Sequence, residues 1–198
     1  MNSPLPEVFL VRHGETEWSI SRQHTGRTDI PLTSAGEANA RGLGTRLQPV
    51  AFNHVFVSPL LRARQTCELA GLGEKAVVDR DLMEWDYGAF EGMRTDEIRQ
   101  TRPEWDLFRD GCPDGESLEA IAARADRVVA RLRECEGKTL VFSHSHFLRV
   151  LATRWLGCPA GNARHLVLQT GGLSIVGYEH DVTEPAIRLW NDTGHLPL

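Results

Sequence analysis

The chain has 198 residues, and its 22 Lys and Arg against 27 Asp and Glu give a formal net charge of −5 at pH 7. This mild acidity excludes a protein that is held to nucleic acid or to a membrane surface by bulk positive charge. Hydrophobic residues make up 41% of the chain, which is enough for a sizeable core. We expect one domain over residues 1–198, without a bilayer-spanning run or a signal-peptide pattern, and therefore a cytoplasmic protein.

The first eighty residues predict strands that alternate with helices. The apolar run over 7–12 predicts a buried strand, and the long polar stretch over 14–32 predicts a functional loop. A capping-box pattern from Ser34 to Glu37 predicts the start of a helix that runs to about residue 47. Strands are then expected over 54–58 and 76–79, with a helix between them from Pro59 to about residue 69.

Residues 81–116 predict an irregular insertion or lid, with a short helix near 94–101. Apolar residues at helical spacing predict a helix over 117–135, before a strand over 138–143 and a helix over 146–156. Strands over 165–169 and 173–178 are expected as a hairpin around Thr170-Gly-Gly172, with a last strand at about 186–190. The alternation of strands and helices predicts an α/β fold, with a mostly parallel sheet covered on both faces.

Basic residues follow the strands at the edge where such sheets bind ligands, beyond their carboxyl ends. Arg12 and His13 end the first strand, Arg62 lies in the first turns of the next helix but one, and His144 directly follows a later strand. Together they would bind a tetrahedral dianion, because guanidinium groups bind phosphate oxygens through charge-assisted hydrogen bonds. A neutral imidazole could then attack phosphorus covalently.

A leaving oxygen would also need a proton donor. The irregular segment offers Glu84, which stands beside aromatic residues that could shelter its carboxyl group. Asp81, Asp86 and Glu91 compete for the role, and composition alone does not choose among them.

A metal site is an alternative interpretation of the two histidines that follow the strand over 138–143. His144 and His146 have the spacing of half a metal site. No set of carboxylate or cysteine partners accompanies them, so we expect no metal and no other cofactor.

Six motifs in chain order resemble the histidine phosphatase superfamily, which includes the cofactor-dependent phosphoglycerate mutases. They are Leu10-Val-Arg-His-Gly-Glu-Thr16, His24-Thr-Gly-Arg-Thr-Asp-Ile-Pro-Leu-Thr33, Ser58 to Thr66, Glu84-Trp-Asp-Tyr-Gly-Ala-Phe-Glu-Gly92, Gly115-Glu-Ser117 and Val141-Phe-Ser-His144. The resemblance spans nearly the whole chain. It implies a three-layer α/β/α sandwich with a mixed, mostly parallel sheet.

The resemblance also implies residue roles. His13 would be the phosphorylated nucleophile, and Arg12, Arg62 and His144 would complete the phosphate pocket. Glu84 would donate the proton to the leaving group and later act as the base for water. The residues expected to contact the substrate are Arg12, Ser19, Thr25, Gly26, Arg62, Tyr87, His144 and His146.

Three departures from the family pattern bear on the activity. Mutases of this family typically carry Asn where this chain has Ser19, and Ser145 stands where the family often has Gly. Mutases also usually carry an insertion with basic and Tyr residues after the proton-donor motif, whereas 93–112 contains no Lys and no Tyr. The motifs around Glu84 and His144 are more similar to the small phosphatase branch, which includes actinobacterial acid phosphatases and fungal sedoheptulose-bisphosphatase.

We therefore expect a metal-independent phosphatase that hydrolyses phosphomonoesters, such as a sugar phosphate, through a phosphohistidine intermediate. A phosphoglycerate mutase and a non-catalytic phospho-ligand-binding module are the alternatives. The expected partner is a small-molecule phosphomonoester rather than a nucleic acid or a membrane, and a homodimer is left open.

Overall fold

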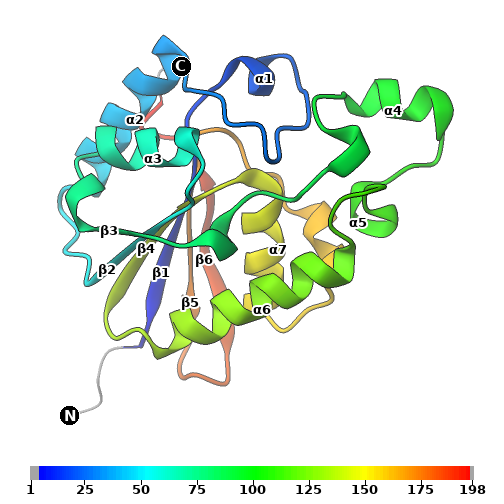
Figure 1. Cartoon of the computed structure of the whole chain (residues 1–198). Coiled ribbons are helices and arrows are strands. Elements are labelled where there is room, and N and C mark those ends of the chain that lie inside the picture. Colours follow the sequence, from blue (N-terminus) through cyan, green and yellow to red (C-terminus); the bar gives the residue numbers. More distant parts are fainter. Residues whose placement is uncertain (1–4, 197–198) are drawn as a thin grey trace.

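The computed structural model describes residues 5–196, in which six strands form one sheet in the order β3-β2-β4-β1-β5-β6 (Figure 1). The four strands β3, β2, β4 and β1 pair in parallel, whereas β5 pairs antiparallel with β1 and with β6. The mixed, mostly parallel sheet is therefore confirmed. The strands are β1 (Glu7–Arg12), β2 (His54–Val57), β3 (Ala76–Val78), β4 (Lys138–Ser143), β5 (Leu173–Tyr178) and β6 (Pro185–Asp192).

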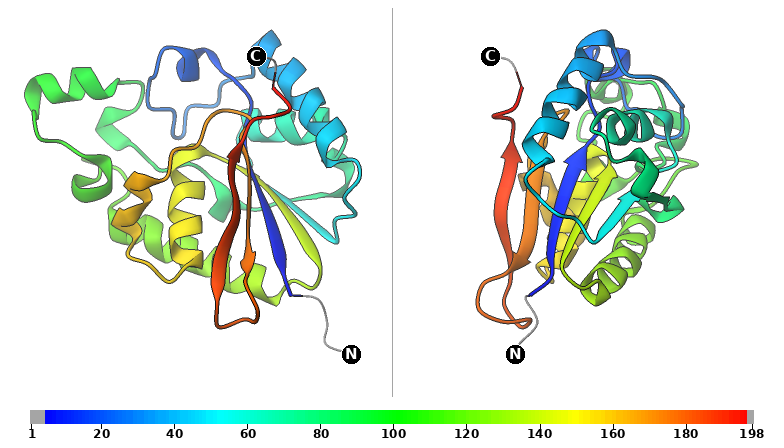
Figure 2. Two further views of the ribbon diagram at one scale, coloured as in Figure 1. Left: turned by 180° about the vertical axis from the view of Figure 1, so that it is seen from behind. Right: turned by 90° about the vertical axis from the view of Figure 1, so that its left-hand side faces the viewer.

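Helices cover both faces of this sheet, which makes the three-layer α/β/α sandwich that the family resemblance implies (Figures 1 and 2). The residues of β1 alternate between the two layers, as side chains of a strand must. Val8 and Leu10 pack in the core with α6 and α7, and Phe9 and Val11 pack in the core with α2 and α3. These helices are α2 (Ser34–Leu47), α3 (Leu61–Leu69), α6 (Leu118–Glu134) and α7 (Ser145–Trp155).

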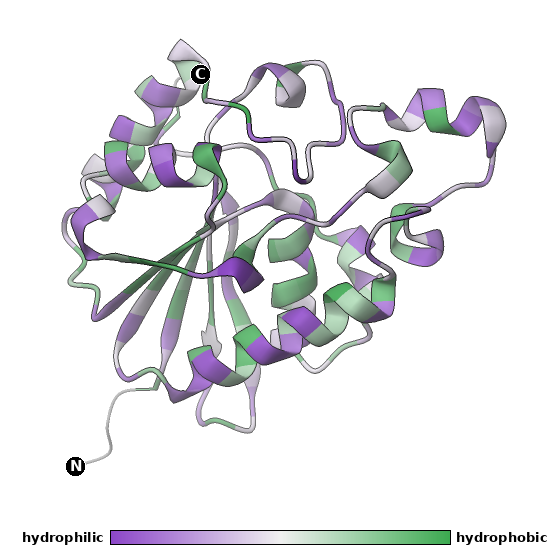
Figure 3. Cartoon of the chain, in the orientation of Figure 1, coloured by the Kyte–Doolittle hydropathy of each residue, from purple (hydrophilic) through white to green (hydrophobic). Residues whose placement is uncertain are grey.

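The two helices of the second layer differ in how much of their surface they bury. α6 is amphipathic, with apolar and hydrophilic positions alternating along it, whereas α7 is apolar over most of its length (Figure 3). Because α7 starts directly after β4, its deep burial fixes its N-terminus at the carboxyl edge of the sheet. No helix between residues 5 and 196 is long and apolar enough to cross a membrane.

The irregular stretch over 81–116 packs into the same core. Its aromatic side chains Trp85, Phe90, Trp105 and Phe108 are buried in one cluster with β1, α6 and α7. The short helix predicted near 94–101 is confirmed as α4. The shorter elements of the chain are α1 (Glu17–Ile20), η1 (Gly73–Lys75), η2 (Arg80–Leu82), η3 (Gly88–Phe90), α4 (Thr95–Thr101), α5 (Leu107–Asp110) and η4 (Ala160–His165).

The strand predicted over 165–169 is wrong. This segment leaves η4 without joining the sheet, because side chains bind its backbone groups instead of a neighbouring strand. The carbonyl of Leu168 accepts a hydrogen bond from Arg12, and the carbonyl of Val167 accepts one from the indole of Trp190. The hairpin at the sheet edge is formed by β5 and β6 instead, so Thr170-Gly-Gly172 leads into the first strand of the hairpin and does not form its turn.

The capping box predicted for α2 is also wrong by one residue. Thr33 is the N-cap, and its hydroxyl accepts a hydrogen bond from the backbone N–H of Gly36. Glu37 forms an ion pair with Arg41 one turn further on instead of returning to the cap. Thr33 and not Ser34 caps the helix, because the Thr33 hydroxyl also donates to the carboxylate of Glu15 and so joins the helix start to the loop after β1.

Candidate active site

The carboxyl ends of β1, β2 and β4 meet at one edge of the sheet. The register pairs the last residue of β1 with the last residue of β4, so the next residues, His13 and His144, emerge side by side. Their ring centroids lie 5.2 Å apart. Ser58 follows β2 at the same edge, and its hydroxyl lies 2.7 Å from Nε2 of His144.

His13 is buried with a defined ring orientation. Its Nδ1 lies 2.7 Å from the carbonyl oxygen of Gly14, which can only accept, so the proton sits on Nδ1 and the lone pair on Nε2. Burial lowers the pKa of His13 well below its usual 6.5, and the positive charges of Arg62 and Arg12 lower it further. His13 is therefore a neutral imidazole with a free electron pair, the form that a nucleophile needs.

His144 is oriented by Ser58. The backbone N–H of Leu60 donates to the Ser58 hydroxyl, which leaves that hydroxyl able to donate its own proton to Nε2 of His144. This places the imidazole proton on Nδ1. Burial, followed by the charge of Arg62, lowers the pKa of His144 well below 6.5, so this ring is neutral as well.

Two arginines flank the histidines, one of them partly and the other fully buried. Arg62 lies in the first turn of α3, fully buried, and donates to three backbone carbonyls of the 25–28 loop at 2.9 to 3.0 Å. Arg12 donates from Nη1 to the carbonyl of Leu168 at 2.6 Å. Burial lowers the pKa of Arg12 to about 10 and lowers the pKa of Arg62, yet both guanidinium groups remain charged at neutral pH.

Three nitrogens of this cluster are buried without a hydrogen-bond partner in the part of the chain that the structure describes. They are Nε of Arg12, Nε of Arg62 and Nδ1 of His144. Buried donors are nearly always paired in folded proteins, so a set of orphaned donors indicates the place of an acceptor from outside the chain. Since each of them can donate, the arrangement fits the oxygens of a tetrahedral anion beside His13.

Glu84 is the carboxylate at this edge, 3% exposed, at the N-terminus of α7. Its Oε1 accepts from the backbone N–H groups of Trp85 and Phe147, and its Oε2 accepts from the N–H of His146 at 3.1 Å. Oε1 thus has both lone pairs engaged, whereas Oε2 accepts one bond and retains room for a proton.

A buried arginine of α6 holds the segment that carries Glu84. The guanidinium of Arg124 donates to the backbone carbonyls of Asp81, Met83 and Glu84, and it forms an ion pair of 2.6 Å with Glu116. Its side chain is 8% exposed, and that of Glu116 is 15% exposed. The guanidinium is therefore a fixed clamp on the backbone of 81–84.

Tyr87 and His146 form a second polar pair in the pocket wall. The Tyr87 hydroxyl lies 2.5 Å from Nδ1 of His146. Burial raises the pKa of Tyr87 well above 10 and lowers the pKa of His146 well below 6.5, so both groups are uncharged. The hydroxyl is then the donor, and the His146 proton sits on Nε2.

These groups border a cavity of 320 Å³. Seven of the residues predicted for the site line it: Arg12, His13, Ser19, Thr25, Glu84, Tyr87 and His146. Arg62 and His144 lie buried beside His13 and do not line the open cavity. Gly26 is also buried, with its N–H bonded to Glu91 and its carbonyl to Arg62, so its backbone supports the site from behind.

Seven further residues line the cavity that were not predicted as site residues, and three of them bring polar side chains from two other segments. Arg22 and His24 come from the loop after α1, and Thr95 comes from the start of α4. Burial lowers the pKa of His24 to about 4, so this ring is neutral too. The two segments meet only in the folded chain, where Gln23 forms a β-bridge with Arg94. No local pattern in the sequence predicts that contact.

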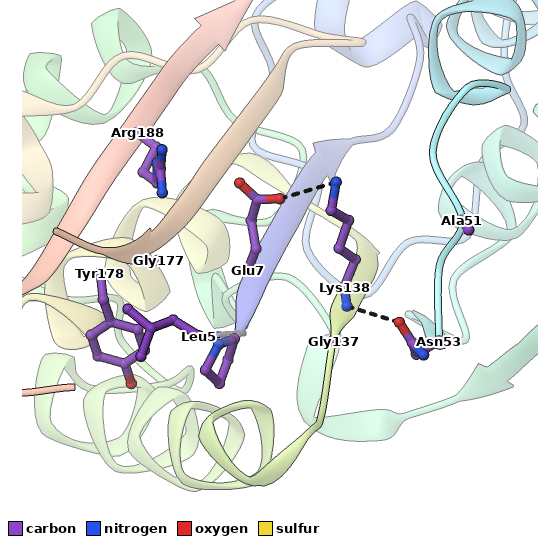
Figure 4. A pocket seen from close by; sticks show the side chains of 10 residues that line it. Leu5, Glu7, Ala51, Asn53, Gly137, Lys138, Gly177, Tyr178 and Arg188 are labelled. Atoms are coloured by element: carbon purple, nitrogen blue, oxygen red, sulfur yellow. Dashed lines mark hydrogen bonds and ion pairs between the residues drawn. The ribbon is translucent and has the colours of Figure 1, made fainter. Parts of the chain in front are cut away.

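A larger cavity of 540 Å³ lies at the opposite end of the sheet, where β1 and β4 begin (Figure 4). Its charged residues are Glu7, Lys138 and Arg188, and Glu7 pairs with Lys138 at 3.5 Å. It contains no histidine, and its cysteine-free lining offers no nucleophile of comparable reactivity. The two buried histidines lie instead at the carboxyl edge.

The family model of the histidine phosphatase superfamily (branch 1) matches residues 8–193. The chain belongs to this superfamily and is a phosphoric monoester hydrolase. It is 38% identical to the acid phosphatase of Mycobacterium tuberculosis over 184 residues, which cover 91% of this chain and 90% of that protein. It is 35% identical to the sedoheptulose 1,7-bisphosphatase of Saccharomyces cerevisiae, covering 96% and 94% of the two chains.

More distant similarity links the chain to the mutase side of the superfamily. A protein of Shigella boydii described as a probable phosphoglycerate mutase GpmB is 34% identical, covering 89% of this chain and 86% of that protein. Among solved structures, the open reading frame Rv3214 of Mycobacterium tuberculosis superposes with a TM-score of 0.91 at 36% identity, covering 96% of this chain and 99% of that one. Together these similarities support a phosphatase acting on small phosphate esters.

Proposed function

We propose that the chain hydrolyses phosphomonoesters of small metabolites through a phosphohistidine on His13, without a metal ion. The observation that carries this proposal is the set of orphaned donors on Arg12, Arg62 and His144 beside a neutral imidazole whose lone pair is on Nε2. These donors would hold the phosphate and stabilise charge on its equatorial oxygens during transfer.

In the first step, the Nε2 lone pair of His13 attacks phosphorus while the bond from phosphorus to the leaving oxygen breaks. Glu84, protonated on Oε2, gives its proton to that oxygen, and the alcohol departs. In the second step a water molecule attacks phosphorus, Glu84 takes a proton from it, and the nitrogen–phosphorus bond breaks. Inorganic phosphate leaves, and both residues return to their starting states.

We assign the remaining predicted residues to the substrate. Ser19, Thr25, Tyr87 and His146 line the cavity next to the reacting groups, and Nε2–H of His146 is available to a substrate hydroxyl. The guanidinium groups of two arginines would neutralise the charge on the phosphoryl oxygens, as Mg²⁺ does in other phosphoryl-transfer enzymes.

We place this reaction in the cytoplasm and name a small phosphorylated molecule, not a nucleic acid, as the partner. The support is the chain's net negative charge and four cysteines that are all free thiols: Cys67, Cys112, Cys135 and Cys158. A homodimer stays a prediction.

The experiment is phosphoenzyme trapping in EDTA with p-nitrophenyl phosphate. Quenching in alkaline detergent should yield a phosphoenzyme that is stable in base and lost in acid, in the wild type and in His180→Ala, whose histidine is exposed and remote. His13→Ala should fold and yield none. Turnover by His13→Ala at a large share of the wild-type rate would refute the mechanism, and interconversion of 2- and 3-phosphoglycerate without phosphate release would favour the mutase.

A further inference from the structure

A second hollow adjoins the catalytic cavity, and the two share lining residues. The neighbouring hollow has a volume of 660 Å³, and Arg22 and Thr95 line both it and the 320 Å³ cavity that contains His13. Residues of the loop after α1 and of α4 with the residue before it line the hollow. Both segments stand over the carboxyl edge of the sheet (Figure 1). A substrate whose phosphate sits on His13 can therefore extend past Arg22 into this space.

The hollow carries uncompensated positive charge. Arg94 is paired with both nearby carboxylates, Asp96 and Glu97. Arg22 makes no ion pair and no side-chain hydrogen bond within residues 5–196, and Arg99 uses only Nε, which donates to a backbone carbonyl. Two exposed guanidinium groups thus present free donors to the hollow.

The backbone holds Arg22 in place at some cost. Its φ of 61° lies in the left-handed region, which disfavours residues other than glycine. The next residues are pinned to the segment before α4, because the side chain of Gln23 donates to the carbonyl of Gly92 and the backbone N–H of His24 donates to that of Met93. A strained conformation that the surrounding contacts maintain is typical of ligand-binding positions.

We propose that Arg22, assisted by Arg99, binds a second anionic group of the substrate. The preferred substrates are then phosphomonoesters that carry a further phosphate or carboxylate. This inference rests on the proposed function, since it places the first phosphate on His13. A guanidinium fork suits both anions, because each presents two oxygens in one plane.

The test compares substrates that differ in the second anion. Fructose 1,6-bisphosphate and 3-phosphoglycerate carry one, whereas fructose 6-phosphate and p-nitrophenyl phosphate do not. Arg22→Gly removes the guanidinium and relieves the left-handed backbone, so the variant should fold. An exposed charge-assisted contact corresponds to about a tenfold change in affinity.

We expect Arg22→Gly to lower kcat/KM about tenfold for at least one of the two substrates that carry a second anionic group, through KM and not kcat. The kcat/KM of Arg22→Gly for fructose 6-phosphate and p-nitrophenyl phosphate should stay within about twofold of the wild-type value, a small change beside the tenfold loss expected when the contact is removed. The bisphosphate and the phosphoglycerate arms show whether the second group is phosphate or carboxylate. Arg22→Lys should retain part of the preference, and Arg41→Ala, an exposed arginine of α2, should behave as wild type.

Equal losses on all four substrates, or no loss on any, would overturn the second anion site. A wild-type enzyme that hydrolyses none of them would instead refute the proposed function. The preference for substrates with a second anion should also weaken as salt is raised, because the distance over which exposed charges attract falls from about 10 Å at 0.1 M to about 3 Å at 1 M ionic strength.

Discussion

Replacement of Glu84 by Gln removes the proton donor but keeps one side-chain oxygen that accepts hydrogen bonds. The side-chain amide has one accepting oxygen, so it can keep the two hydrogen bonds that Oε1 now receives from Trp85 and Phe147. Its NH₂ group cannot accept, so the N–H of His146 loses the partner that Oε2 provides. A buried donor left without a partner costs about 1–3 kcal/mol, so we expect Glu84→Gln to be destabilised by about that amount but folded.

The expected loss of activity depends on the leaving group. General acid catalysis is worth roughly 10²–10⁴-fold in rate, and a sugar alkoxide leaves badly without a proton. Glu84→Gln should therefore slow phosphorylation by a sugar phosphate by about that factor. Nitrophenolate leaves unaided, so phosphorylation by p-nitrophenyl phosphate should slow much less.

The assay is the pre-steady-state burst in a rapid-quench instrument, because Glu84 is also the base for water and steady-state kcat would fall for every substrate. Asp86→Asn is the control, since that carboxylate was an alternative candidate and binds Gly88 and Arg27 instead of α7. It should leave the contrast between substrates intact. Equal slowing of the burst for both substrates in Glu84→Gln would show that Glu84 only supports the structure.

Further variants test the other groups. His144→Ala should lower kcat by roughly 10²–10³, the effect of losing one preorganised donor, and a change in KM alone would mean that His144 only binds. Because burial holds the pKa of His13 below 6.5, NMR titration should find this ring still neutral at pH 6.5, and a protonated ring there would contradict its burial. Activity should survive EDTA and be inhibited by vanadate, whereas loss on chelation with recovery on a divalent ion would overturn the metal-free mechanism. Arg124→Met should lower the free energy of unfolding by about 3–5 kcal/mol in urea, because it removes the ion pair with the partly buried Glu116 and the donor to three backbone carbonyls, and a loss below about 1 kcal/mol would refute that assignment.

The positions of the strand ends could be predicted because they depend on local signals. Apolar runs over 7–12 and 138–143 define two buried strands, and parallel pairing alone then brings His13 next to His144. Glu84 needed the family resemblance, since four acidic residues in one irregular segment look alike by composition. The structure distinguishes them by contact: only the carboxylate of Glu84 accepts hydrogen bonds from the N-terminus of α7.

The features that sequence patterns missed depend on contacts between distant segments. The segment over 165–169 looks like a strand locally, but the side chains of Arg12 and Trp190 take its carbonyls. The Arg124 clamp on 81–84 and the contact of Gln23 with Arg94 join parts of the chain that show no shared periodicity. Such contacts arise from tertiary packing, which local propensity does not encode.

The order of strands in the sheet also determines when the site can exist during folding. β4 lies between β1 and β2, although it follows both of them by many residues in the chain. The strands that deliver His13 and Arg62 therefore have no direct pairing until residues 138–143 insert between them. On a ribosome, where the N-terminal part emerges first, both residues leave the tunnel before His144, the third member of the phosphate pocket, has been made. The phosphate pocket is complete only when the last parallel strand docks, so occupancy of the pocket reports that β4 has paired with both β1 and β2.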